Sequence, residues 1–200
     1  MKEPFAKFVE TQLGSNILLI TCGLPGTWKT ETAAEISKIK NILILRTDII
    51  RLQVLKNEDI FDAKVAGNMN KRESVYDEMF RQAEELARKG HGVILDATFV
   101  TQSLRSRAAE IAEKTGVPFV IQQTHCSEEA SLARIGRRTK ENYESNALTK
   151  DAYIANKNKF EIVDIDQLKQ KYPKLQITHL TVDTEYDTPK DWYIIGKETR

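Results

Sequence analysis

Short apolar runs alternate along this chain with segments in which apolar residues recur at helical spacing. The runs occupy residues 17–22, 42–45, 93–96, 117–125 and 176–182. Continuous apolar runs of this length are typical of strands that are buried on both faces. Helical spacing predicts helices over 2–13, 29–39, 48–55, 74–89, 101–114, 127–138 and 149–160. Buried strands that alternate with helices predict a parallel sheet with helices on both faces and right-handed crossovers.

The ends of two predicted helices carry residues that stop or start helices. Thr101 is placed to cap the helix over 101–114 and Gly116 to end it, while Gly90 ends the helix over 74–89. No internal repeat, low-complexity tract or linker rich in Pro, Gly and Ser divides the sequence. The sequence therefore predicts one α/β domain over residues 1–200.

Composition excludes several classes of protein. The chain has 30 Lys and Arg against 29 Asp and Glu, a formal net charge of +1, which argues against a protein that coats nucleic acid or binds membranes through a polybasic surface. Two cysteines, Cys22 and Cys126, are too few for a disulfide scaffold or a structural zinc site and are expected to be buried. No run approaches the ~20 apolar residues of a membrane span, and no signal peptide is evident. We expect no membrane partner and a cytoplasmic location.

The segment between the first predicted strand and the next helix has the pattern of a phosphate-binding loop. This loop, the P-loop or Walker A motif, has Gly, four residues, and then Gly-Lys-Ser/Thr. Here it consists of Gly23, Leu24, Pro25, Gly26, Thr27, Trp28, Lys29 and Thr30. Its backbone N–H groups would surround phosphate oxygens, the lysine would reach the terminal phosphates and the threonine hydroxyl would help to hold Mg²⁺. The alternative is a turn that precedes a helix and binds no phosphate.

One residue of this loop departs from the pattern. Trp28 stands where the motif has its second glycine, which normally lets the backbone approach the phosphate closely. The indole must point out of the loop, toward the base or the solvent, because it would otherwise crowd the site. Trp28 therefore leaves open whether the loop supports ordinary turnover.

Two acidic residues follow predicted strands, at the edge of the sheet where α/β proteins bind ligands. Asp96 ends the run over 93–96, as in a Walker B element that holds the metal or orients the P-loop hydroxyl. Asp48 precedes Arg51 by one helical turn. A carboxylate there can accept the proton of an attacking hydroxyl, and an arginine can bind an anionic acceptor. Capping of a strand or a helix is the structural alternative for each acid.

Arg134 and Arg138 are four residues apart in the helix predicted over 127–138, and so are expected on one face of it. Guanidinium groups that close over phosphates stabilise the charge that develops during phosphoryl transfer. A solvated basic helix end is the alternative. The polar segment over 139–158 would suit a lid.

These features together resemble the small P-loop kinases, which include polynucleotide 5′-hydroxyl kinases and many ATP-dependent kinases of unknown substrate. The resemblance covers about residues 17–160. It rests on the loop, the spacing of the acid and arginine after the second strand, and further motif residues, namely Tyr76, Asp96, Ala97, Thr98, Phe99, Arg105, Arg107, Arg134 and Arg138. It implies a three-layer P-loop NTPase fold with a five-stranded parallel sheet in the order 2-3-1-4-5 and a helical lid over about 134–160.

The resemblance also implies an enzyme that uses ATP and Mg²⁺ to transfer the γ-phosphoryl group to a hydroxyl group. The acceptor would be a small molecule or a nucleic-acid 5′-end. The residues expected to act are Lys29, Asp48, Arg134 and Arg138 in catalysis, Asp48 and Arg51 at the acceptor, and Thr30 and Asp96 at the metal. The sequence departs from the family at Trp28 and at Asn146, where many relatives have Asp. An ATP-binding regulatory module of weak or no activity is the alternative function.

Overall fold

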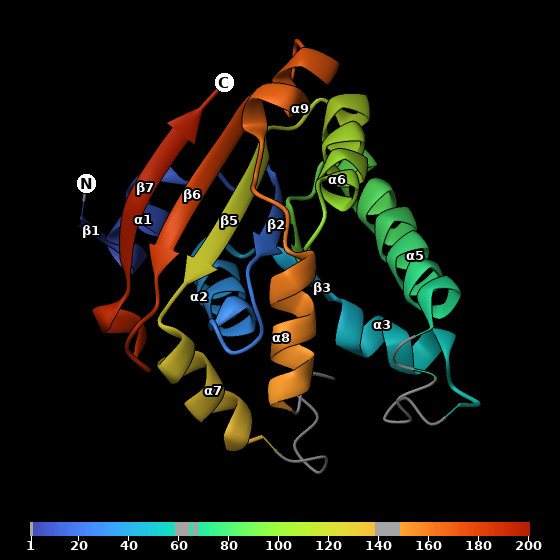
Figure 1. Cartoon of the computed structure of the whole chain (residues 1–200). Helices are drawn as coiled ribbons and strands as arrows, with labels where there is room; N and C mark the ends of the chain where they lie inside the picture. Colours follow the sequence, from blue (N-terminus) through green and yellow to red (C-terminus); the bar gives the residue numbers. More distant parts are fainter. Residues whose placement is uncertain (1, 59–64, 66–67, 139–148) are drawn as a thin grey trace.

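One mixed sheet forms the centre of the structure (Figure 1). The computed structural model describes residues 2–58, 65, 68–138 and 149–200. Within them the sheet has seven strands in the order β1-β7-β6-β5-β2-β4-β3. The strands are β1 (Glu3–Pro4), β2 (Leu18–Cys22), β3 (Leu43–Arg46), β4 (Val93–Asp96), β5 (Phe119–His125), β6 (Ile177–Asp183) and β7 (Tyr193–Thr199).

Helices connect the strands and flank the sheet. They are α1 (Phe5–Gln12), α2 (Lys29–Lys40), α3 (Thr47–Val54), α5 (Met69–Arg88), α6 (Gln102–Thr115), α7 (Glu128–Gly136), α8 (Lys150–Lys159), α9 (Ile165–Lys171) and the short 3₁₀ helix η1 (Pro189–Asp191). None of the described helices is both long and apolar enough to cross a membrane.

The five predicted strands are all present, parallel and in the predicted order, so the α/β P-loop fold is confirmed. The predicted number of strands is wrong, because β7 and β1 extend the sheet in antiparallel pairing. The hydrophobic pattern of β7 does not indicate a buried strand. Its apolar run covers only Tyr193–Ile195, and the strand then continues through Gly196 and exposed polar residues to Thr199.

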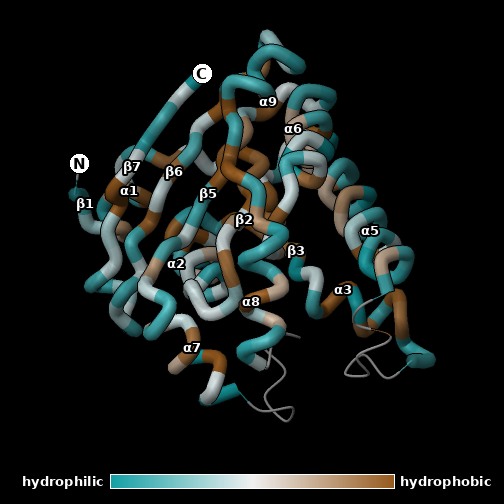
Figure 2. The backbone as a smooth tube through the Cα atoms, viewed as in Figure 1, coloured by the Kyte–Doolittle hydropathy of each residue, from teal (hydrophilic) through white to brown (hydrophobic). Residues whose placement is uncertain are grey.

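Two hydrophobic clusters hold the layers together. On one face of the sheet α1 and α2 contribute Phe5, Phe8 and Ile36, and on the other α5, α6 and α9 contribute residues such as Met79 and Leu168. Figure 2 shows hydrophobic and polar residues alternating along these helices, as expected of helices with one buried face. The layers thus leave the carboxyl ends of β2, β4 and β3 together beside the phosphate loop.

Helix boundaries follow capping residues more closely than apolar spacing. The side chain of Thr101 accepts a hydrogen bond from the N–H of Leu104, and Gly116 ends α6, as predicted. Asn68 caps α5, which therefore begins at Met69. The predicted start at residue 74 is wrong because the first turn is polar and carries no apolar periodicity. Helix α9 is too short for apolar spacing to predict.

Arg105, on α6, is a buried charged residue of structural importance. Its side chain donates to the carbonyl oxygens of Phe99 and Val100 after β4 and to those of Glu161 and Ile162 after α8. It has no exposed surface. Four carbonyl groups from two loops therefore depend on one guanidinium.

We predict that Arg105→Met lowers the free energy of unfolding by about 3 kcal/mol, since it removes the buried guanidinium whose hydrogen bonds join the loop after β4 to the loop after α8. The measurement is urea denaturation followed by circular dichroism. Arg81→Met is the control, because Arg81 lies on the exposed side of α5 and forms ion pairs with Glu78 and Glu85 at the surface; it should leave the midpoint nearly unchanged. Equal midpoints for the two variants would contradict the role of Arg105.

Candidate active site

The loop between β2 and α2 is shaped by two glycines. Gly23 and Gly26 have φ angles of 141° and 81°, which residues with a Cβ atom rarely adopt. A Cβ atom at Gly23 would lie 2.8 Å from the carbonyl oxygen of Thr124, and one at Gly26 would lie 2.5 Å from that of Ser131. Both glycines are therefore required by close packing against β5 and α7 as well as by the backbone.

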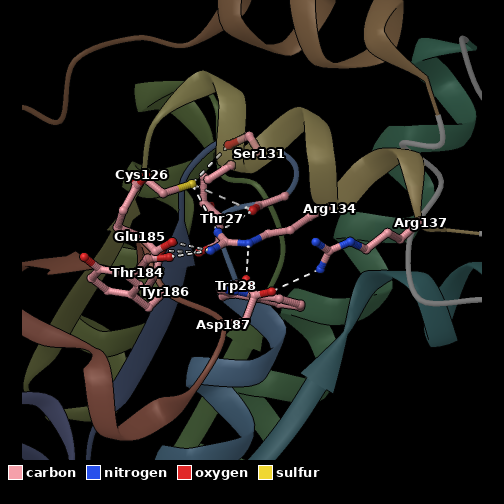
Figure 3. Close-up of polar contacts among 12 residues, drawn as sticks. Thr27, Trp28, Cys126, Ser131, Arg134, Arg137, Thr184, Glu185, Tyr186 and Asp187 are labelled. Atoms are coloured by element: carbon pink, nitrogen blue, oxygen red, sulfur yellow. Dashed lines mark hydrogen bonds and ion pairs between the residues drawn. The ribbon is translucent and has the colours of Figure 1, made fainter.

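Trp28 has a left-handed backbone despite its side chain, with φ 58° and ψ 33°. This conformation costs about 1–2 kcal/mol for a residue other than glycine. The indole Nε1 donates to Asp187 Oδ1 at 3.3 Å, and the Arg134 guanidinium carbon lies 4.8 Å from the ring centroid (Figure 3). The indole thus has partners outside the loop, in agreement with the expectation that it points outward.

Lys29 is the first residue of α2 and lies across the loop. Its Nζ donates to the carbonyl oxygen of Leu24 at 2.6 Å. Burial lowers the pKa of Lys29 from 10.5 to about 8, while the negative charge of Asp96 raises the pKa and the positive charge of Arg138 lowers it. The ammonium group is therefore held among charges in a site from which water is partly excluded, where an anionic phosphate would stabilise it.

Thr30 and Asp96 face each other across the end of the sheet. The Thr30 hydroxyl donates to Asp96 Oδ2 at 2.7 Å, and the Thr21 hydroxyl lies 3.1 Å from Asp96 Oδ1. Asp96 is buried. A helix hydroxyl and a buried carboxylate thus meet directly beside the loop.

This pair fits a Mg²⁺ ion. Magnesium is bound by oxygen ligands and usually takes one or two from the protein, with the rest from water and substrate phosphates. Among the described residues no group of three or more His, Cys, Asp and Glu could form a metal site made of protein ligands alone. Thr30 and Asp96 offer the one or two protein oxygens that such an ion takes.

Asp48 lies in the first turn of α3 and pairs with Arg51, whose Nη1 is 2.8 Å from Asp48 Oδ1. The N-cap of α3 is Arg46 and not Asp48, so the capping alternative for Asp48 is wrong. Burial raises the pKa of Asp48, the charge of Arg51 opposes this, and the charge of Asp96 adds to it. A carboxylate with a raised pKa is a better proton acceptor.

Several residues near the acids were not predicted from the sequence. Arg46 Nε lies 3.5 Å from Asp96 Oδ2 and is a buried nitrogen with no hydrogen-bond acceptor among the described residues. Glu31 follows the loop, and its pKa is raised by burial and further by Asp96. Tyr76, on α5, is a motif residue of the resemblance to which no role was given; burial raises its pKa, and a hydrogen bond to Thr98 opposes this. Position in the sequence could have pointed to the first two of these residues. Arg46 directly follows the predicted strand over 42–45, and Glu31 directly follows the loop.

Arg134 lies on α7 with its guanidinium buried, and its five N–H groups all have acceptors. Nη2 donates to the carbonyl oxygens of Thr184 and Glu185, each at 2.9 Å, and Nε donates to Asp187 Oδ1. Nη1 donates to the carbonyl oxygen of Gly26 at 3.1 Å and to the sulfur of Cys126 at 3.3 Å (Figure 3). This arrangement differs from the prediction that Arg134 contacts the transferring phosphoryl group, since its donors are already used.

Arg138 is positioned differently from Arg134. Helix α7 ends at Gly136, so the prediction that both arginines share one helix face is wrong. The backbone N–H of Arg138 donates to the carbonyl oxygen of Ile135 at 3.1 Å, and its charge lowers the pKa of Lys29. Of the two arginines, Arg138 is the one whose charge reaches the loop lysine. The rest of the predicted lid over 139–148, with Asn146, lies outside the described residues.

Comparisons with known proteins agree with this fold. A sugar kinase from Janibacter sp. HTCC2649 superposes with a TM-score of 0.62 at 13% identity, covering 87% of this chain and 88% of that one. A gluconokinase from Sinorhizobium meliloti 1021 gives 0.56 at 13% identity, covering 86% and 85%. Kti12 from Chaetomium thermophilum, in complex with ADP-AlF3, gives 0.56 at 16% identity, covering 78% and 96%. Among curated proteins none matches the chain.

A family model described as an AAA domain matches residues 18–162. The match begins at β2 and includes the loop from Gly23 to Thr30, Asp48, Asp96 and Arg138. Because it spans most of the chain, from β2 through α8, this protein belongs to that family of AAA domains with the fold of small P-loop kinases.

Proposed function

We propose that the protein is an ATP-dependent kinase that transfers the γ-phosphoryl group to a hydroxyl group of a small molecule or a nucleic-acid 5′-end. The observation that carries the proposal is the convergence of Lys29, Thr30 and Asp96 at the loop, with Asp48 coupled to Asp96 through their charges. Phosphoryl transfer needs these parts: a cation and amides for the phosphates, oxygen ligands for Mg²⁺ and a base for the acceptor.

The donor side of the proposed reaction uses the loop. Lys29 and the loop amides bind the β- and γ-phosphates, while Thr30 and Asp96 hold the metal. Bound Mg²⁺ would neutralise charge on the phosphate oxygens. Arg138 stabilises the negative charge of the transferring group, a role we assign to it in preference to Arg134 because its charge acts on Lys29.

The acceptor side uses Asp48. The acceptor oxygen attacks the γ-phosphorus, the bond from that phosphorus to the β,γ-bridging oxygen breaks, and ADP leaves. Asp48 takes the hydroxyl proton, and burial, which raises its pKa, favours that transfer. Arg51 forms an ion pair with Asp48. Burial raises the pKa of Tyr76, and the positive charges of Arg72 and Arg51 lower it, so both arginines lie near that side chain. This cationic surrounding suits an acceptor that carries negative charge.

Two features bear on the choice of acceptor. The net charge of +1 favours a small molecule over a long nucleic acid, and the fold is shared with a gluconokinase and a sugar kinase. Arg51 beside Asp48 keeps a nucleic-acid 5′-hydroxyl end, with its anionic backbone phosphate, among the candidates. A panel of sugars, sugar acids, nucleosides and 5′-hydroxyl oligonucleotides, with ADP release as the readout, separates these classes.

The alternative is an ATP-binding module of low activity, and it rests on the strained backbone of Trp28. Under this alternative, ATP binds but no acceptor in the panel stimulates ADP release, and Trp28→Gly increases turnover. Under the kinase proposal, at least one acceptor stimulates ADP release by the unmodified protein. Absence of nucleotide binding would refute both.

We predict that Asp48→Asn lowers kcat about 100-fold or more while the Kd for ATP stays within about twofold, because the base acts only on the acceptor. Steady-state kinetics and calorimetry measure the two quantities. Asp77→Asn is the control, since Asp77 is an exposed residue of α5 that pairs with Arg107. Unchanged kcat in Asp48→Asn would remove Asp48 from the mechanism.

We predict that the affinity for ADP falls at alkaline pH. The pKa of Lys29 in the free protein is about 8, so the ammonium form that binds phosphate predominates below pH 8 and is lost above it. The Kd measured by calorimetry should be flat from pH 6.5 to 7.5 and then rise, by up to about tenfold per pH unit.

The control for this pH dependence is Lys29→Arg, which keeps a positive charge throughout the range. Its Kd should vary little between pH 7 and 9.5. The same alkaline rise in both proteins would assign the effect to another group.

A further inference from the structure

Three successive residues of the phosphate loop are held from outside by α7 and by the segment between β6 and β7. The carbonyl oxygen of Gly26 accepts from Arg134 Nη1 at 3.1 Å. The carbonyl oxygen of Thr27 accepts from Thr184 Oγ1 at 3.0 Å. The indole of Trp28 donates to Asp187, which lies in the same segment as Thr184, and it also contacts the guanidinium of Arg134 (Figure 3). The contacts thus reach each loop residue from 26 to 28.

Both residues that hold the loop carbonyls are buried. Only 4% of the Arg134 side chain is exposed, and Thr184 has no exposed surface. Thr184 Oγ1 also lies 3.1 Å from the carbonyl oxygen of His125 at the end of β5. Arg134 is bound in turn by the carbonyl oxygens of Thr184 and Glu185. The loop is therefore attached to side chains that the sheet and α7 already fix.

The geometry of a peptide bond gives these contacts a consequence for anion binding. In a trans peptide the C=O of one residue and the N–H of the next point in opposite directions. Fixing the carbonyls of Gly26 and Thr27 toward α7 and the β6–β7 segment therefore directs the N–H groups of Thr27 and Trp28 to the other side of the loop. Those N–H groups are ones that a P-loop offers to phosphate.

We propose that Arg134 and Thr184 are positioning residues for the nucleotide, an inference that rests on the proposed function of the loop. They act through the loop carbonyls and do not touch the phosphates. Arg134 has a second effect, since its contact with the indole and its bond to Asp187 hold Trp28 in the left-handed conformation that glycine adopts without strain. The Arg134–Asp187 pair thus compensates for the glycine that the loop lacks.

The first test uses the protein without nucleotide. Hydrogen exchange of the peptide over residues 23–30 is measured for the unmodified protein, Arg134→Gln and Thr184→Val. Both variants should exchange these amides at least about tenfold faster, since each removes a buried donor. Arg137→Gln is the matched control: Arg137 also binds Asp187, at 3.1 Å, but its side chain is 70% exposed. Exchange equal to the unmodified protein in both variants would overturn the inference.

The second test separates positioning from direct contact with the phosphoryl group. Arg134→Gln should raise the KM for ATP about tenfold while kcat changes less than about threefold, as for loss of binding that is equal in ground state and transition state. A loss confined to kcat would overturn the inference and make Arg134 a catalytic residue. Thr184→Val should raise the KM by a smaller factor, and it keeps the test decisive if Arg134→Gln does not fold.

The third test addresses Trp28. The rise in Kd for ADP caused by Arg134→Gln is measured in the unmodified background and in the Trp28→Gly background. The rise should be smaller in the Trp28→Gly background, because glycine needs no support in this conformation. An equal rise in both would show that Arg134 does not act through Trp28. If no nucleotide binds to the unmodified protein the proposed function fails, whereas the exchange measurement still decides the effect on the loop.

Discussion

The carboxylate of Asp96 is the group on which the site depends. It is buried at the end of β4, and hydrogen bonds from Thr21 on β2 and Thr30 on α2 join both of its oxygens to the elements on either side of the loop. A buried charge is stable only where donors and opposite charges surround it. Here the two donors, Thr21 and Thr30, lie close before the loop and at its end. The hydrogen bonds that stabilise the buried carboxylate therefore also fix the positions of the two ends of the loop.

Next to the larger effect of burial, the same charge shifts the pKa values of its neighbours. It raises the pKa of Lys29 against the effect of burial, and it raises the pKa values of Asp48 and Glu31. A divalent cation at Asp96 would cancel much of this influence. Under the proposed function, metal binding and proton acceptance by Asp48 would therefore be linked through one electrostatic centre.

The sequence allowed the central fold and much of the site to be predicted, for physical reasons. Strands buried on both faces must be apolar throughout, which makes the five parallel strands visible, and a phosphate loop is confined to one short segment. Strand β7 was missed because a strand with one buried residue resembles a polar loop. The hydrogen bonds of Arg134 could not be predicted because most of its acceptors are backbone carbonyl oxygens. Every residue has such an oxygen, so the sequence does not indicate which of them an arginine will bind.

The hydrogen bond between Thr184 and Thr27 joins residues 157 positions apart. A Walker A motif is recognised from eight residues, yet the shape of this one is completed by the segment between β6 and β7, two strands away from β2 in the sheet. Bringing together residues so far apart in the chain has an entropic cost that only the completed sheet offsets. The motif can thus be recognised from a local sequence, but its shape depends on residues far away in the chain. An isolated peptide of the same eight residues would lack the partners that orient its amides.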